Sequence, residues 1–214
     1  MILGIYGSGG SGCEVREIAE QQNIWEKIVF IDDMVEVGVF KGIERMPFKS
    51  FVQIYDKDTA EIVIALGEPE HKIALCHKVK EKEYPLAKVL HPMAWISPSA
   101  NLEEGLIVHA QSFISSDTLI EENTCIEPGT IVGHDCIIRR NCQIAPNATL
   151  GGHCEVGEGT YIGMNVSVKE GIKIGKNSII GMGSTVLRDI PENVIALGNP
   201  ARVMKYKNGT KVFR

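Results

Sequence analysis

The stretch IVGHDCIIRRNCQIAPNATLGGHCEVGEGTYIGMNVSV, residues 131–168, decides the fold because its aliphatic residues recur every six positions. The same count continues without a break through the second half of the chain. The residues at these positions are Ile96, Leu102, Val108, Ile114, Ile120, Ile126, Val132, Ile138, Ile144, Leu150, Val156, Ile162, Val168, Ile174, Ile180 and Val186. Hexapeptide periodicity is the signature of a parallel β-helix, in which three hexads make one triangular coil. We expect the aliphatic side chains to point into the prism.

A second set of residues, four positions after the aliphatic ones, is mostly small. Its small members are Ala100, Ser112, Thr118, Thr124, Thr130, Cys136, Cys142, Ala148, Cys154, Thr160, Ser178 and Ser184. We expect these side chains near the corners of the coils. Three of the six cysteines belong to this set, which favours small buried side chains over a thiol metal site. No CxxC pair occurs, and we expect reduced thiols in a cytoplasmic protein.

The first part of the chain follows a different pattern, with strands and helices in alternation. We expect strands at 1–6, 27–33, 60–66 and 86–90, and helices at 11–22 and 68–82. This order predicts a small parallel α/β domain, a Rossmann-like half domain. The expected domains are therefore 1–90 (α/β), 91–200 (β-helix) and 201–214 (a C-terminal tail).

The overall composition excludes several partners. The chain has 214 residues and a formal net charge of −5, so we expect no nucleic-acid partner and no acidic membrane surface, since both require a basic face. We also expect no membrane span, because no apolar run is long enough. The N-terminus reads as a strand and not as a signal peptide.

The segment GIYGSGGSGCE, residues 4–14, has the outline of a dinucleotide-binding turn, and two acids, Asp32 and Asp33, end the next strand. A dinucleotide needs two mononucleotide halves, whereas fewer than 100 residues precede the coils, which is room for one. The loop therefore fits a nucleotide diphosphate, held by backbone N–H groups at a helix N-terminus, better than NAD. A purely structural glycine turn is the alternative.

Several motifs together carry a family resemblance. The hexads VGHDCI, VGEGTY, IGKNSI and IGMGST, and the segment ALGNPARVMK at 196–205, resemble the hexapeptide-repeat acyltransferases. The glycine-rich loop, the "IDD" segment, "IALGEPEHK" and "LHPMAWISPSA" resemble, more narrowly, the sialic-acid O-acetyltransferase (NeuD/PglD-like) family. That family includes nucleotide-4-amino-sugar N-acetyltransferases. The resemblance implies a left-handed β-helix, a homotrimer, acetyl-CoA as co-substrate and a nucleotide-linked amino sugar as acceptor.

By matching position, the resemblance also implies site residues. The nucleotide sugar would be bound by Gly9, Gly10, Ser11, Asp32, Asp33 and Gly67, and coenzyme A by Gln143, Met164 and Met182. Two positions depart from the family: Ser11 replaces a histidine common in the loop, and Gln143 replaces a second histidine found in many relatives. Because glutamine is no base at neutral pH, a two-histidine mechanism is disfavoured.

His134 is the candidate general base. It follows the inward-pointing Val132 by two residues, near the outer surface, and Asp135 can orient its ring. The "GHDC" hexad matches the family's catalytic histidine followed by an acid, and Gly152 matches its oxyanion donor. We expect no metal: no His-x4-His occurs, His91 and His109 lack an evident third ligand, and His153 misses the His134 column by one residue.

These features predict acetyl transfer from acetyl-CoA to the amino group of a nucleotide-linked 4-amino-dideoxy sugar by direct attack. No Ser–His pair at plausible spacing suggests an acyl-enzyme. The alternative is O-acetylation of sialic acid or a related sugar. A non-catalytic trimeric scaffold is a third, weaker hypothesis.

Overall fold

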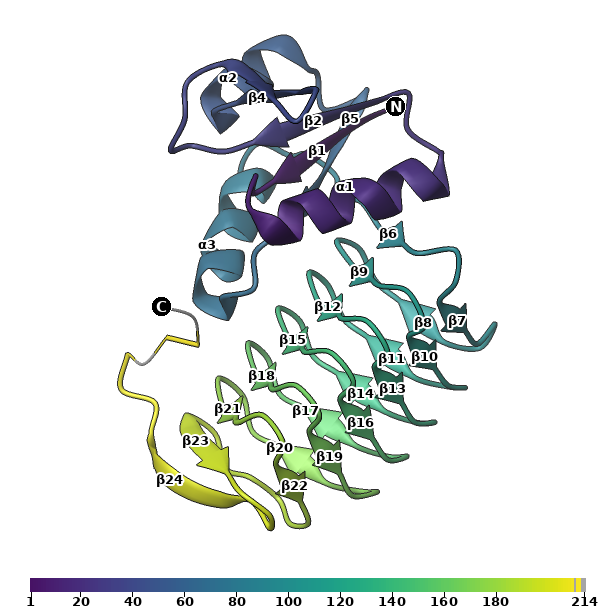
Figure 1. Ribbon diagram of the computed structural model, residues 1–214, viewed down its shortest axis with the longest axis vertical. Coiled ribbons are helices and arrows are strands. Elements are labelled where there is room, and N and C mark those ends of the chain that lie inside the picture. Colours follow the sequence, from purple (N-terminus) through teal and green to yellow (C-terminus); the bar gives the residue numbers. More distant parts are fainter. Residues whose placement is uncertain (210, 213–214) are drawn as a thin grey trace.

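The computed structural model describes residues 1–209 and 211–212, and its N-terminal part is an open α/β sheet (Figure 1). The sheet order is β3-β4-β2-β1-β5, and only β3 runs antiparallel to its neighbour. The strands are β1 (Ile2–Tyr6), β2 (Lys27–Ile31), β3 (Gly38–Phe40), β4 (Ile43–Met46) and β5 (Ala60–Ile64). The helices are α1 (Gly10–Gln22), α2 (Phe48–Ile54) and α3 (Pro69–Lys80).

The expected and observed elements of this domain differ between residues 38 and 54. The sequence reading contains neither the hairpin β3–β4 nor the short helix α2, because these segments are too short to show a clear period. The strand expected at 86–90 is also shorter. Only β6 (Val89–Leu90) is a named strand, and Leu86 makes an isolated bridge to Ile62.

The second part is a left-handed parallel β-helix with three faces. The first face holds β7 (Trp95–Ile96), β10 (Phe113–Ile114), β13 (Ile131–Val132), β16 (Thr149–Leu150), β19 (Ser167–Val168) and β22 (Thr185–Val186). The second holds β8 (Asn101–Leu102), β11 (Leu119–Ile120), β14 (Ile137–Ile138), β17 (Glu155–Val156) and β20 (Lys173–Ile174). The third holds β6, β9 (Ile107–Val108), β12 (Cys125–Ile126), β15 (Gln143–Ile144), β18 (Tyr161–Ile162), β21 (Ile179–Ile180), β23 (Val194–Leu197) and β24 (Arg202–Tyr206).

The strand register follows the hexad count. Each strand pairs in parallel with the strand eighteen residues later, as in Ile114↔Val132↔Leu150. The aliphatic column forms one continuous buried core, and only its first two members, Ile96 and Leu102, are partly exposed. We call the turns between faces the first corner (first to second face), the second corner (second to third) and the third corner (third to first).

The small side chains at the corners act as hydrogen-bond donors. Thr118 Oγ1 donates to the carbonyl of Gly133 at 2.8 Å, fifteen residues later. Cys136 and Cys142 donate from Sγ to the carbonyls of Gly151 and Gly157 at 3.2 and 3.1 Å in the same pattern. Burial raises the pKa of the Cys142 thiol to about 12, so it stays protonated and able to donate. These cysteines therefore replace threonine in a structural role.

A third column escaped the sequence reading. Every sixth residue from Gly105 to Gly183 has a positive φ and lies in the turn at a corner. Most of these positions hold Gly, Asn or Asp, the residues that adopt the left-handed region at least cost. Asp135 (φ 56°) and His153 (φ 59°) both belong to this column. Asp135 therefore has a structural reason to be present, besides its position after His134.

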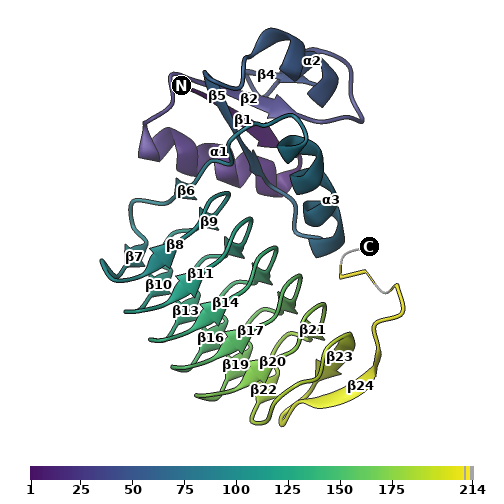
Figure 2. The same ribbon diagram turned by 180° about the vertical axis from the view of Figure 1, so that it is seen from behind.

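The two parts share a core, so the α/β domain has a fixed place on the prism (Figures 1 and 2). Val15 and Ile18 of α1 belong to one buried cluster with Ile107 and Cys125 of the third face. Helix α3 meets the second corner, where Lys80 forms an ion pair with Glu122. β6, at the proposed boundary near residue 90, already pairs with β9. None of the helices in the described residues is long and apolar enough to cross a membrane.

The segment expected as a tail folds back. β24 pairs antiparallel with β23 at the end of the third face, and the chain then returns toward α3 (Figure 2). The buried Lys207 forms an ion pair with Glu70 of α3 at 3.4 Å, and the Val212 amide donates to Glu68 at 2.9 Å. The C-terminal segment thus links the two domains.

Candidate active site

The first corner presents His134 at the surface. Val132 points inward, and the chain then turns through Gly133, His134 and Asp135 into the second face. His134 Nδ1 lies 2.7 Å from Asp135 Oδ2, and both side chains are about half exposed. Since an ionised carboxylate only accepts, this contact favours the tautomer of a neutral ring that carries its proton on Nδ1. In that tautomer Nε2 is the acceptor atom.

Gly152 lies directly against that nitrogen. It occupies the same corner one coil later, and a Cβ added to it would stand only 2.6 Å from His134 Nε2. Glycine is therefore required if the ring is to keep its position. Within the described part of the chain, the Gly152 N–H donates no hydrogen bond. The predicted base and the predicted oxyanion donor are thus adjacent.

His153 joins this group, although the column count had separated it from His134. Its ring meets the His134 ring edge to face, with centroids 4.9 Å apart. Its Nδ1 lies 3.9 Å from Asp135 Oδ2. The count was correct, but His153 occupies the left-handed position of its turn, and its ring contacts His134 of the preceding coil. Two imidazoles and one carboxylate therefore meet at this corner.

Some glycines of the glycine-rich loop are required by the backbone of the turn, whereas others face free space. Gly7 has φ +119° and faces the Ala65 carbonyl, and a Cβ on Gly12 would meet the Gly7 carbonyl oxygen at 1.9 Å. These two glycines are required by the turn. No atom lies within 4 Å of a Cβ built on Gly9 or Gly10. The N-terminus of α1, which lacks a side-chain cap, is thus left accessible to an anion.

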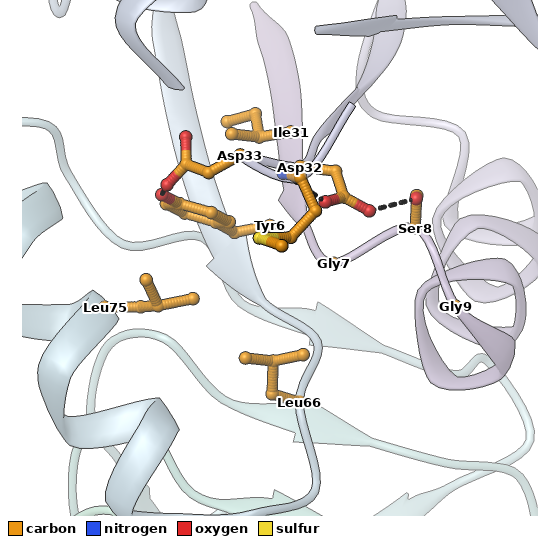
Figure 3. Close-up of a pocket in the computed structure, with 10 residues that line it drawn as sticks. Tyr6, Gly7, Ser8, Gly9, Ile31, Asp32, Asp33, Leu66 and Leu75 are labelled. Carbon is orange, nitrogen blue, oxygen red and sulfur yellow. Dashed lines mark hydrogen bonds between the residues drawn. The ribbon is translucent and has the colours of Figure 1, made fainter. Parts of the chain in front are cut away.

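A pocket of about 280 Å³ opens beside this loop (Figure 3). Three of the six residues predicted for the nucleotide sugar line it, namely Gly9, Asp32 and Asp33. The other lining residues are Tyr6, Gly7, Ser8, Ile31, Met34, Leu66 and Leu75. Gly10 and Gly67 follow lining residues directly in the chain, Ser11 is two residues after Gly9, and none of the three lines the pocket. The pocket joins an apolar floor to two carboxylates and a helix N-terminus.

The two carboxylates have different surroundings. Asp33 accepts hydrogen bonds from the Tyr6 hydroxyl, from Lys78 Nζ and from the Phe48 amide, the last at 2.9 Å. Burial alone would raise the pKa of Asp33, but the bonds from Lys78, Tyr6 and Phe48 outweigh it and lower the pKa. Asp32 accepts from the Ser8 hydroxyl and the Met34 amide, and it faces the pocket (Figure 3). Asp32 is the acid better placed to bind a ligand.

The residues predicted for coenzyme A lie elsewhere. Met164 and Met182 are exposed and stacked one coil apart at the third corner. Gln143 is buried on the third face, where its amide donates to Glu127 Oε1 at 2.6 Å. His134 is on the first corner, a different edge of the prism. One protomer therefore does not bring these residues to His134.

Sequence reasoning missed the polar groups around Gln143. His109 Nε2, Cys125 Sγ and a Glu127 oxygen lie within 4.8 Å of one another, so His109 does have neighbouring ligand-type atoms. Burial, with a smaller effect of His91, lowers the pKa of His109 to about 4. Burial raises the pKa of Glu127. His109 Nε2 and Gln143 Oε1 have no hydrogen-bond partner among the described residues. The column count could have grouped His91, His109 and Glu127, which are eighteen residues apart.

Comparison with known families covers both parts of the chain. Residues 3–79 match the PglD N-terminal domain, and residues 117–152 and 153–188 match the bacterial transferase hexapeptide (six repeats). A glycine-rich nucleotide-type loop and a hexapeptide prism with a surface histidine define the class: the chain is a hexapeptide-repeat acyltransferase.

Solved structures narrow that class. The acetyltransferase domain of PglB from Neisseria gonorrhoeae FA1090 in complex with acetyl coenzyme A matches at 26% identity and TM-score 0.90, over 95% of this chain and 98% of that one. PerB from Caulobacter crescentus in complex with CoA and GDP-perosamine matches at 28% identity and TM-score 0.89, over 96% and 98%. WeeI from Acinetobacter baumannii AYE matches at 26% and 0.89, over 95% and 100%. The chain belongs to the NeuD/PglD-like sugar acyltransferase family, resembling its nucleotide-4-amino-sugar N-acetyltransferases.

Proposed function

We propose that this protein transfers the acetyl group of acetyl-CoA to the amino group of a nucleotide-linked 4-amino-dideoxy sugar. The observation that carries the proposal is the first corner: Asp135 holds His134 Nδ1 at 2.7 Å, and Nε2 lies beside Gly152. The relatives add support, because one is bound to acetyl coenzyme A and another to CoA and GDP-perosamine.

The chemistry assigns one task to each group. His134 Nε2 accepts the proton that the amine loses as its nitrogen bonds to the thioester carbonyl carbon. The Gly152 N–H donates to the carbonyl oxygen as that oxygen becomes anionic. Asp135 stabilises the imidazolium that forms. When the carbon–sulfur bond breaks, His134 returns the proton to the departing sulfur, and the base is regenerated.

The nucleotide end of the acceptor is assigned to the pocket beside α1. Gly9, Gly10 and Ser11 at the start of the helix offer N–H groups to a diphosphate. Asp32 accepts hydrogen bonds from ribose or base, whereas Asp33 shapes the wall through its bonds to Tyr6 and Lys78. Gly67 follows Leu66, which lines the same pocket.

The proposal includes a homotrimer. The α/β domain packs on the third face and second corner, while His134 is on the first corner. A site that contains the pocket, the coenzyme residues Gln143, Met164 and Met182, and His134 is therefore completed by two protomers. A cytoplasmic location belongs to the same proposal and is supported by six free, buried cysteines.

Turnover with acetyl-CoA and a panel of UDP-, GDP- and dTDP-linked 4-amino sugars tests the function. We expect one nucleotide series to be acetylated on nitrogen, read by mass and by release of free thiol. Sialic acid and other hydroxyl acceptors are the comparison set. Reaction of hydroxyl acceptors alone would replace N-acetylation with O-acetylation. Failure of every acceptor under saturating acetyl-CoA would favour a scaffold.

A further inference from the structure

His153 has no assigned role, yet it lies against the proposed base. Its ring is edge to face with the His134 ring, at an interplanar angle of 89°. Asp135 Oδ2 stands between the two Nδ1 atoms, 2.7 Å from that of His134 and 3.9 Å from that of His153. The His153 amide also donates to the His134 carbonyl at 2.8 Å, which fixes the spacing of the two turns. One carboxylate oxygen thus accepts from the His134 ring and lies within ion-pair distance of the His153 ring.

The turn itself does not require a histidine. The left-handed column holds mostly Gly, Asn and Asp, and Gln111 and His153 are its exceptions. Asn would satisfy the same φ of 59° at least as well. The side chain of His153 is about half exposed, so it does not fill a core position either. Its contacts with His134 and Asp135 are what distinguish it.

The other charged groups near this corner come from the adjacent coils. Asp117 occupies the equivalent turn position one coil earlier, and Lys169 and Glu170 precede the equivalent position, Gly171, one coil later. Among the described residues, the ion pairs and ring contacts of His153 are those with Asp135 and His134. The dominant electrostatic coupling of His153 is therefore with the proposed base and its carboxylate.

We propose that His153 is a positioning residue that acts through Asp135 and keeps His134 unprotonated, and hence active as a base, to lower pH. This inference rests on the proposed function of His134. A positive charge on one ring opposes a second positive charge on the other ring, whose centroid is 4.9 Å away. Removal of His153 would leave Asp135 to favour the protonated form of His134 alone.

Loss of His153 should shift the pH dependence of kcat/KM. Without His153, the acidic limb of the kcat/KM profile moves to higher pH, because His134 then takes up its proton more readily. For two charges about 5 Å apart in an exposed site, the shift is about half a pH unit. A fixed positive charge at the same place moves the limb in the opposite direction.

The test compares pH profiles of the full-length enzyme with His153→Asn and His153→Lys. We expect the acidic limb of kcat/KM to lie at the highest pH in His153→Asn, at an intermediate pH in wild type and at the lowest pH in His153→Lys. Gln111→Asn is the matched control, because it makes the same kind of change at another left-handed turn without removing an imidazole. An unchanged limb in His153→Asn, or a shift of equal size in Gln111→Asn, overturns the inference.

A second measurement needs no substrate. The Cε1–H resonance of His134, followed by NMR against pH in wild type and His153→Asn, reports the same coupling in the free protein. We expect its transition to move upward by about half a pH unit in the variant. Coincident curves would refute the role of His153 whether or not an amino sugar is acetylated. Thus failure of this inference is separable from failure of the proposed function.

Discussion

The two halves of this molecule position polar side chains by different means. In the β-helix, His134 and Gly152 meet because they are eighteen residues apart in a repeat without insertions. In the α/β domain, Asp33 is held by Tyr6 and Lys78, which are 27 and 45 residues away along the chain. The first arrangement depends on the uninterrupted six-residue repeat and the second on tertiary packing. Changes in the β-helix should therefore act locally, whereas changes in the α/β domain should reach several elements.

The sharpest test of this contrast is His134→Ala. We expect kcat/KM to fall by about 10²–10⁴-fold, because the base is lost, while the thermal midpoint stays close to that of wild type. The side chain is half exposed and its ring contact is with His153, which is also about half exposed, so the free energy of unfolding should change little. Steady-state kinetics and calorimetry measure the two effects. Full activity in the variant would remove His134 from the mechanism.

Gly152→Ala tests whether one added methyl group acts only on its neighbour. The new Cβ would stand 2.6 Å from His134 Nε2, so the ring must move, and we expect about a 10²-fold loss in kcat/KM. Stability should change little, because the displaced atoms are the end of a side chain. Gly38→Ala is the control, since no atom lies within 4 Å of its Cβ. Equal activity of both variants would show that Gly152 is not needed to keep the His134 ring in position.

Asp32→Ala extends the contrast to the pocket. Loss of the carboxylate removes a hydrogen-bond acceptor for the nucleotide, and we expect the Kd to rise about tenfold. Titration calorimetry with UDP, GDP and dTDP measures the change and identifies the base at the same time. Asp58→Ala, at an exposed acid outside the pocket, serves as the control. Equal affinities in the two variants would show that Asp32 does not bind the nucleotide.

A smaller effect is expected at the turns. Asn165 has φ 55° and an exposed side chain, so Asn165→Ala should lower the free energy of unfolding by about 1 kcal/mol. Asn165→Gly should be close to neutral, since glycine adopts this conformation freely. Urea denaturation of both variants gives the comparison. If the two variants lose the same free energy of unfolding, the positive φ is not the reason why asparagine occurs at this position.

The smallest effect concerns pH. Because the pKa of Asp33 is lowered in the folded protein, its contribution is present above the ordinary value of 3.8 and disappears as pH falls through the folded value. The group is partly exposed and therefore screened, so we expect Asp33→Asn to cost about 0.5–1 kcal/mol at pH 6. The cost should shrink below pH 3.8. Urea midpoints measured across this range check the sign.

The β-helix could be predicted almost completely from the sequence, and the α/β domain only in outline. A period of six fixes which residues point inward, which pair, and which share a corner, so Val132, His134 and Gly152 could be placed in advance. Lys78 and Tyr6 could not be placed beside Asp33, since that contact depends on how α3 packs against the sheet. β3, β4 and α2 were missed for a related reason: their short segments are stabilised by tertiary contacts.

The site was predicted less well than its scaffold. The reading of Asp135 as the partner of His134 matches the geometry, but the column count separated His153 from the pair because it followed positions and not side-chain directions. Gln143 was placed by a match in sequence, and its burial against Glu127 depends on the α/β domain that covers the third face. Side-chain direction and domain packing are the two things that periodicity does not specify.

The fifteen-residue hydrogen bonds at the corners have a consequence for how such a protein can diverge. Each joins a side chain of one coil to the backbone of the next, so these coils are linked locally and need no distant partner. Residues on the outside of one rung can then be exchanged while the rungs above and below keep their shape. During evolution, the outward-facing residues of a single coil can therefore change while the β-helix keeps its fold.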